Sequence, residues 1–188
     1  MKNTVTALLL INSMALAGDY YGGVDFNFGK GSEKWKQNNT INYDFTNTAY
    51  GLHMGYNLNQ NSMIEVSFKL LTFDFKENGI KDDDGTQFGV DYLYTLNEVS
   101  KLKPYLGLGL TYSTKDIDIA NLNEDTVTGI GFKLRGGAYY PLTPKLDLGI
   151  ELNYNSVMWD EVEFQGNNTN LKMSSDFYGL GLNLNYKF

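Results

Sequence analysis

Apolar residues alternate with small or polar residues along most of the chain after Gly18. The first segment carries one mostly apolar set, Tyr20, Gly22, Val24, Phe26 and Phe28, and between its members lie Tyr21, Gly23, Asp25, Asn27 and Gly29. Successive side chains of a β-strand point to opposite faces. The alternation therefore predicts a strand with one apolar face and one small or polar face.

Seven further segments repeat this pattern. The eight predicted strands cover residues 20–28, 50–58, 64–75, 88–96, 106–112, 130–140, 146–154 and 178–188. In the third, the apolar phase slips at Leu70-Leu71 and continues at Phe73 and Phe75, which predicts a bulge or a change near a rim. The segments suit the length of a transmembrane β-strand, about 9–11 residues.

The connections between these strands alternate between long and short. The long, polar ones are residues 30–46, 76–86, 115–126 and 156–174, and the short ones are 59–62, 97–103 and 141–145. Aromatic residues end the apolar stripes at Tyr20, Tyr56, Tyr94, Tyr140, Tyr154, Tyr178, Tyr186 and Phe188. A soluble β-sandwich would also alternate, but aromatic girdles with long loops on one side are typical of bacterial membrane barrels. We therefore predict an all-β fold, an eight-stranded antiparallel up-and-down transmembrane β-barrel.

The N-terminus has the pattern of a secretory signal peptide. Lys2 supplies the positive charge, an apolar stretch runs from Leu8 to Leu16, and Ala15-Leu16-Ala17 is an A-x-A cleavage site. We predict a signal peptide over residues 1–17 and one barrel domain over residues 18–188. Removal of Lys2 would change the net charge from −7 to −8.

Composition narrows the possible functions. The chain has no cysteine, which excludes disulfides, thiolate metal sites and a cysteine nucleophile. The negative charge argues against a nucleic-acid partner, because binding to phosphates requires a basic face. The mean hydropathy is −0.33, and no run of 18 apolar residues predicts a transmembrane helix.

Charges of both signs fall on the polar faces of the predicted strands. They are Glu65, Lys69, Asp91, Lys133, Arg135, Asp147 and Glu151, beside Asp25. In a barrel these side chains would face the lumen, and a buried charge without a partner is costly. We therefore predict a structural lumen network of ion pairs, with Lys133 and Arg135 able to reach Asp147 or Glu151 on the adjacent strand.

Few residues indicate catalysis or metal binding. His53 is the single histidine and lies on the polar face of the second strand without a neighbouring nucleophile, which favours a structural role in the lumen. Residues 82–85 (Asp-Asp-Asp-Gly) could attract a hard cation, but they lack EF-hand spacing and read as a solvated loop, as do Asp160, Glu161 and Glu163. We expect no catalytic residue, cofactor or metal.

The last strand resembles the C-terminal assembly signal of small eight-stranded outer-membrane barrels, the family of outer membrane protein X and the membrane domain of outer membrane protein A. Its outward residues are Tyr178, Leu180, Leu182, Leu184, Tyr186 and Phe188. The family pattern has glycine five residues before the terminal aromatic, whereas this chain has Asn183 there and Gly181 nearby. The resemblance implies that the outer-membrane insertion machinery recognises this strand.

The resemblance also implies an integral outer-membrane location, with both mature termini periplasmic, the long loops extracellular, and outer-membrane lipid and lipopolysaccharide as neighbours. It specifies function less well, because one fold carries many functions. The leading hypothesis is a non-enzymatic protein whose surface-exposed loops have a structural, interaction or adhesion role. A narrow, porin-like channel and a lipid-modifying barrel enzyme are the alternatives. The sequence names no extracellular partner.

Overall fold

The computed structural model of the chain describes residues 20–37, 39–76, 82–117, 125–163 and 170–188. The predicted signal peptide, residues 1–17, lies outside these ranges. No helix in the described part of the chain is long and apolar enough to cross a membrane.

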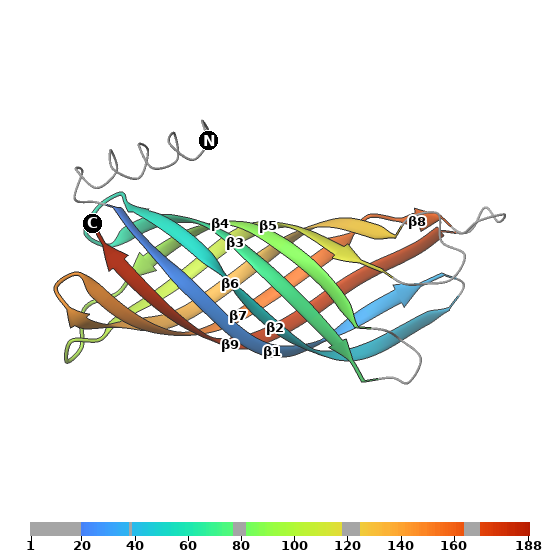
Figure 1. Cartoon of the computed structure of the whole chain (residues 1–188), viewed down its shortest axis with the longest axis horizontal. Helices are drawn as coiled ribbons and strands as arrows, with labels where there is room; N and C mark the ends of the chain where they lie inside the picture. The colour runs from blue at the N-terminus through green and yellow to red at the C-terminus, as the bar shows by residue number, and fades with distance from the viewer. Residues whose placement is uncertain (1–19, 38, 77–81, 118–124, 164–169) are drawn as a thin grey trace, which may run out of the picture.

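Long antiparallel strands make up almost all of the described structure (Figure 1). Their bounds are β1 Tyr20–Lys36, β2 Thr40–Asn57, β3 Ser62–Phe75, β4 Asp83–Thr95, β5 Lys103–Asp116, β6 Thr126–Thr143, β7 Leu146–Trp159, β8 Val162–Glu163 and β9 Asn170–Lys187. Each strand from β1 to β7 pairs with the next along the chain, and β7 pairs with β9. The two-residue strand β8 pairs only with the start of β9.

The sheet closes into a ring because β1 also pairs with β9. The closing ladder runs without interruption from Tyr21↔Lys187 to Lys36↔Lys172, and Figure 1 shows the two strands side by side in blue and red. Closure satisfies the backbone groups that an open edge would leave unpaired. The predicted eight-stranded, antiparallel, up-and-down barrel is thus confirmed, with β1–β7 and β9 as its wall.

The strands are longer than the alternation of apolar residues predicted. Residues 30–46 were expected as a loop, yet β1 continues to Lys36 and β2 begins at Thr40. Likewise, β7 continues to Trp159 and β9 begins at Asn170. We call this end of the barrel the hairpin end, and we call the opposite end, where β1 begins and β9 finishes, the terminal end.

An apolar belt surrounds the middle of the barrel. Side chains such as Leu52, Leu110 and Leu152 are 63%, 68% and 67% exposed, although each lies in the middle of a strand. Exposed aromatic residues border the belt: Phe28, Tyr50, Tyr112 and Tyr178 toward the hairpin end, and Tyr56, Tyr94, Tyr140 and Tyr186 toward the terminal end. The barrel therefore presents apolar surface outward, as expected of a protein whose wall contacts lipid.

The bulge predicted at Leu70-Leu71 is absent. Leu70 pairs with Tyr50 and Leu71 with Ala49, and the ladder continues without a shift to both neighbouring strands. Leu70 is exposed and Leu71 is buried, so the inward and outward alternation also continues. The bulge is therefore wrong, and the other alternative, a change near the rim, accounts for the slip: inward positions become apolar toward the hairpin end, as at Leu71 and Phe73.

Candidate functional site

The interior of the barrel is filled by three groups of side chains, stacked from one end to the other. A charged group occupies the middle, an apolar cluster occupies the hairpin end, and an aromatic group lies toward the terminal end. These groups decide whether the barrel can conduct or catalyse.

Arg135 of β6 is the centre of the charged group. Its Nε donates to Glu151 at 2.6 Å, and one of its terminal nitrogens contacts Glu65 at 2.5 Å and Asp91 at 3.2 Å. Lys133 adds an ion pair to Asp91, with its Nζ 2.6 Å from the carboxylate. All these side chains are almost fully buried. The guanidinium thus joins β6 and β7 to β3 and β4 across the lumen.

Two tyrosines from the aromatic group supply further donors to these carboxylates. The Tyr105 hydroxyl donates to Glu151 at 2.6 Å, and the Tyr21 hydroxyl donates to Glu65 at 3.0 Å. The Tyr105 and Tyr139 rings stack with centroids 4.5 Å apart. The carboxylates are therefore both charge-paired and hydrogen-bonded, the arrangement that offsets the desolvation of buried ions.

His53 joins a second part of the charged group. Its Nδ1 lies 2.9 Å from Asp25 and its Nε2 lies 2.6 Å from the side-chain oxygen of Asn185. Lys69 lies 3.9 Å from Asp25. Asp25 and Asn185 thus engage both ring nitrogens, and Nε2 also lies 4.0 Å from a Glu65 oxygen. The sequence placed His53 on the polar face, but only closure of the barrel brings it to Asn185 of β9.

Asp147 lies apart from the other residues predicted for the lumen network. It pairs with Lys187 at the terminal end, with 2.6 Å between Nζ and a carboxylate oxygen. It contacts neither Lys133 nor Arg135, because Arg135 pairs in register with Asn153 of β7 and Asp147 lies six residues before Asn153, toward the terminal end. Glu151 is therefore close enough to form an ion pair with Arg135, whereas Asp147 is too far away.

The apolar cluster at the hairpin end was not anticipated. Its buried members are Phe45, Ala49, Leu71, Phe73, Ile117, Val127, Val157, Trp159, Val162, Leu171, Met173 and Phe177. Most of them lie in segments that the sequence analysis assigned to loops. Their own alternation, as at Val157 and Trp159 or at Leu171 and Met173, was the available indication that strands continue there.

A buried lysine lies within this cluster. Lys115 Nζ contacts both oxygens of Glu33, at 2.7 and 2.8 Å, and lies 3.1 Å from Asp83. Trp159 donates to Ser175, which in turn donates to Glu33. These contacts tie β1, β4, β5, β7 and β9 together at the hairpin end.

The acidic loop residues do not converge on a metal site. Asp83 turns inward to Lys115, whereas its neighbours Asp82 and Asp84 are exposed. Asp160 accepts a hydrogen bond from Thr128, and Glu161 pairs with Lys172. Among the described residues, no group of three histidines or carboxylates has the arrangement of a metal site.

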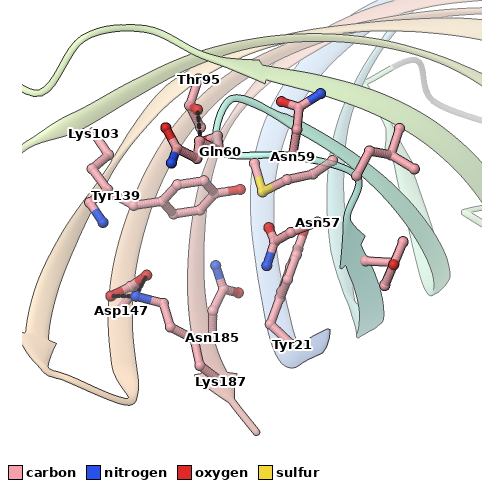
Figure 2. Close-up of a pocket in the computed structure, with 13 residues that line it drawn as sticks. Tyr21, Asn57, Asn59, Gln60, Thr95, Lys103, Tyr139, Asp147, Asn185 and Lys187 are labelled. Carbon is pink, nitrogen blue, oxygen red and sulfur yellow. Dashed lines mark hydrogen bonds and ion pairs between the residues drawn. The ribbon is translucent and has the colours of Figure 1, made fainter. Parts of the chain in front are cut away.

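The terminal end holds an open cavity of about 560 Å³ (Figure 2). Its lining includes Tyr21, Tyr139, Lys103, Asn185 and the ion-paired Asp147 and Lys187. In Figure 2 the Tyr139 ring crosses the cavity, and Asn185 rises between it and Tyr21. Tyr21 and Asn185 are buried and contact the charged group, and buried Tyr139 stacks on Tyr105, so the cavity is a vestibule that ends at these side chains.

The model of the family described as "Outer membrane protein beta-barrel domain" matches residues 4–188. The chain belongs to this family. An outer-membrane barrel accounts for the ring of strands, the exposed apolar belt and the polar middle of the lumen. No curated protein sequence matches closely enough to count as a relative.

Solved outer-membrane barrels share the fold at low sequence identity. OprG from Pseudomonas aeruginosa has a TM-score of 0.62 and 18% identity, over 92% of this chain and 96% of that one. Neisserial surface protein A has a TM-score of 0.55 and 21% identity, over 90% and 97%. AlkL, whose structure was determined in DMPC lipid bilayers, has a TM-score of 0.54 and 15% identity, over 91% of each chain. The outer membrane is therefore the location of this integral barrel, and the likeness to these structures extends to the fold alone.

Proposed function

We propose that this outer-membrane barrel is a closed, non-enzymatic protein that displays its hairpin end outside the cell as a rigid surface for interaction. The observation that carries the proposal is the filling of the lumen. Buried side chains occupy the interior from Tyr139 near the terminal end to Trp159 near the hairpin end.

Two separate layers of side chains inside the lumen argue against a channel. Eight strands leave an interior just wide enough for side chains to fill. In the middle, Arg135 spans the lumen to carboxylates on three strands. Beyond it, Phe45, Phe73 and Phe177 pack edge-to-face with centroids 5.2–6.0 Å apart, which leaves an apolar barrier above the charged one.

A catalytic role for His53 is also disfavoured. A general base requires a nucleophile within hydrogen-bond distance and a free nitrogen to accept its proton. Asp25 and Asn185 occupy both ring nitrogens of this buried residue. The arrangement supports a structural role.

The two ends of the barrel support the proposed orientation. Short turns and both ends of the barrel wall share the terminal end, as in bacterial outer-membrane barrels with periplasmic turns. The barrel strands at the hairpin end continue beyond the belt and enclose an apolar interior of their own. We call this part of the barrel the lobe. The proposal therefore places the termini in the periplasm and the lobe outside.

Planar-bilayer recording of the purified full-length chain tests the closed lumen. We expect no stepwise conductance above the background of the empty bilayer. A matched eight-stranded barrel with a known open pore, recorded under the same conditions, shows that a conductance would be detected. Reproducible single-channel steps from this chain would support the porin-like alternative instead.

Cysteine labelling in intact cells tests the orientation. The chain has no native cysteine, so Asn39→Cys reports on the hairpin end and Asn59→Cys on the terminal end. A membrane-impermeant maleimide should label Asn39→Cys in intact cells and Asn59→Cys only after the outer membrane is opened. The reverse pattern would contradict the proposed orientation.

Comparison of lipid A by mass spectrometry, from cells with and without the protein, tests the enzymatic alternative. We expect identical acylation in both. A change in acyl chains that depends on His53 would overturn the non-enzymatic part of the proposal.

A further inference from the structure

A lysine without a partner among the described residues lines the cavity at the terminal end. The charged side chains of the described lining are Lys103, Lys187 and Asp147. Lys187 and Asp147 pair with each other, with 2.6 Å between Nζ and a carboxylate oxygen. The Lys103 ammonium forms no ion pair or hydrogen bond with any described residue. In a chain of net charge −7, the cavity is thus locally positive and would attract an anion.

Side-chain amides make up much of the polar wall of this cavity. They belong to Asn57, Asn59, Gln60 and Asn185. Each such amide offers two donors and an acceptor. Gln60 hydrogen-bonds in the described structure only through its main-chain oxygen, which accepts from Thr95 at 3.5 Å. Its side-chain amide therefore remains available to a ligand that carries both donors and acceptors.

A fixed aromatic ring supplies an apolar part of the wall. Tyr139 is buried and stacks on Tyr105, with centroids 4.5 Å apart. In Figure 2 the Tyr139 ring crosses the cavity, with Gln60 on one side of it and Asp147 on the other. Met63, also buried, lines the same cavity. An apolar group of a ligand can pack on this surface beside the amides.

The rim of the cavity is held in place by hydrogen bonds. The Asn61 side chain donates to the Thr95 carbonyl at 3.0 Å, and the Thr95 amide donates to the Asn61 carbonyl at 2.8 Å. These bonds tie the turn after β2 to the end of β4. The volume of about 560 Å³ lies within the usual range of small-molecule sites, about 300–1,000 Å³. A ligand would therefore bind without first ordering the turn, which is a cost in flexible sites.

We propose that the cavity at the terminal end binds a short peptide through its free C-terminal carboxylate. The carboxylate would pair with Lys103, and the peptide groups would hydrogen-bond to the side-chain amides of Asn59 and Gln60. One apolar side chain of the peptide would pack on Tyr139. The peptide would stop at this ring, so that binding leaves the lumen closed. The inference goes beyond the proposed function, which concerns the hairpin end.

Titration calorimetry of the folded full-length chain in detergent micelles tests the site. The probes are an N-acetylated tripeptide that ends in leucine with a free carboxylate, the same tripeptide with a C-terminal amide, and glucuronate. The amino terminus is blocked because Asp147, the carboxylate in the lining, is already paired with Lys187. We expect the free acid to bind at least about tenfold more tightly than the other two, because a charge-assisted hydrogen bond is stronger than a neutral one.

Salt should weaken the binding of the free acid, since ions screen charges near the surface. Equal binding of the C-terminal amide would overturn the role of the carboxylate. Equal binding of glucuronate would show a general anion site in place of a peptide site. No binding of the free acid would overturn the whole proposal.

A set of single variants assigns the binding to the cavity. Lys103→Gln should weaken binding of the free acid by about tenfold or more, whereas Lys103→Arg keeps the charge and should retain most of the affinity. The control is Lys145→Gln, which makes the same change in net charge outside the cavity lining, where Lys145 Nζ lies 5.7 Å from the Tyr186 ring centroid. Unchanged binding by Lys103→Gln, or an equal loss in Lys145→Gln, would overturn the assignment.

Heat-modifiable migration checks that each variant is folded. If Lys103→Gln does not fold, the comparison of the free acid with the amide on the unchanged chain still decides the proposal.

These measurements are independent of the orientation in the membrane. If the cysteine labels report an extracellular terminal end, the proposed function fails even when the tripeptide binds. If they report a periplasmic terminal end and the tripeptide does not bind, only the peptide-site proposal fails.

Discussion

Single buried cations link the strands inside this barrel, one in the middle and one at the hairpin end. Arg135 makes contacts with three carboxylates, and Lys115 makes contacts with two. Each cation is surrounded by side chains from strands that are distant along the ring. Removing either cation would leave buried carboxylates without their main cationic partner, and hydrogen bonds from Tyr105, Tyr21 and Ser175 do not neutralise their charge.

Replacing Arg135 with alanine should lower the stability of the barrel strongly. Loss of one partner from a buried ion pair typically costs about 3–5 kcal/mol. Urea unfolding in detergent micelles, followed by tryptophan fluorescence, measures the effect. Lys145→Ala, on the exposed surface, should change the midpoint little. Because the apolar cluster still closes the hairpin end, the Arg135→Ala barrel should also remain non-conducting, and unchanged stability would contradict the proposed role of the network.

Inward and outward side chains of one strand contribute differently to the free energy of unfolding. Strand β3 allows the two to be compared. Phe68 points outward and is 48% exposed, whereas Phe73 points inward and is fully buried. The two residues have the same side chain and lie five positions apart. The strand therefore offers an internal test of which face contributes packing.

Phe73→Ala should destabilise the folded barrel in detergent by about 3–5 kcal/mol, the range for a buried phenylalanine. Phe68→Ala should cost clearly less, because its side chain exchanges protein contacts only for detergent or lipid. The same urea titration measures both. Equal losses would mean that the apolar cluster is loosely packed.

The last strand carries both the closing ladder and the resembled assembly signal. Tyr186 and Phe188 have ring centroids 5.5 Å apart, and the Phe188 amide donates to the Tyr20 carbonyl at 3.2 Å. Lys187, between them, turns inward to Asp147. The outward residues Tyr186 and Phe188 can therefore be tested separately from Lys187, which lies between them and points inward.

Deleting Phe188, or replacing Tyr186 and Phe188 with aspartate, should block assembly in the outer membrane. A charge on the lipid-facing side costs about 2–4 kcal/mol at mid-membrane and less near the interface. Failed recognition of the last strand by the insertion machinery would therefore cause most of the loss of assembled protein. The folded fraction in outer-membrane preparations, measured by heat-modifiable migration, reports the result. Lys187→Gln should assemble normally, and normal levels of the truncated chain would refute the role of the signal.

The whole molecule is a barrel with a lipid-facing belt around its outside and buried side chains filling its interior. At the hairpin end the barrel extends beyond the belt. A barrel with such a belt has to be delivered to the outer membrane, and we predict that residues 1–17 direct this delivery. The remaining chain then forms the complete wall, since β1 begins at Tyr20.

Cleavage after Ala17 should leave a mature chain that begins at Gly18. Intact-mass measurement of the protein purified from outer membranes checks this directly. Replacing Ala17 with a bulky residue such as phenylalanine should slow processing, because the A-x-A site requires small residues. A purified chain that retains Met1 and Lys2 would show that the segment is not a cleaved signal peptide.

The sequence by itself determined the class of fold. A period of two, aromatic residues at the ends of apolar stripes and alternating connection lengths are local properties, and the wall of a barrel is built from local hairpins. The inward direction of Arg135 and Glu151 follows from the same alternation, because a one-residue shift would move either side chain to the lipid face.

Only the tertiary structure decided which charges meet and where the barrel ends. Arg135 reaches Glu65 and Asp91 across the lumen, and His53 meets Asn185 only because β1 closes on β9. The apolar interior at the hairpin end was missed because polar outward residues, such as those between Lys30 and Lys36, resemble a loop in the sequence. Contacts across a closed ring depend on strand register and lumen width, which no local pattern encodes.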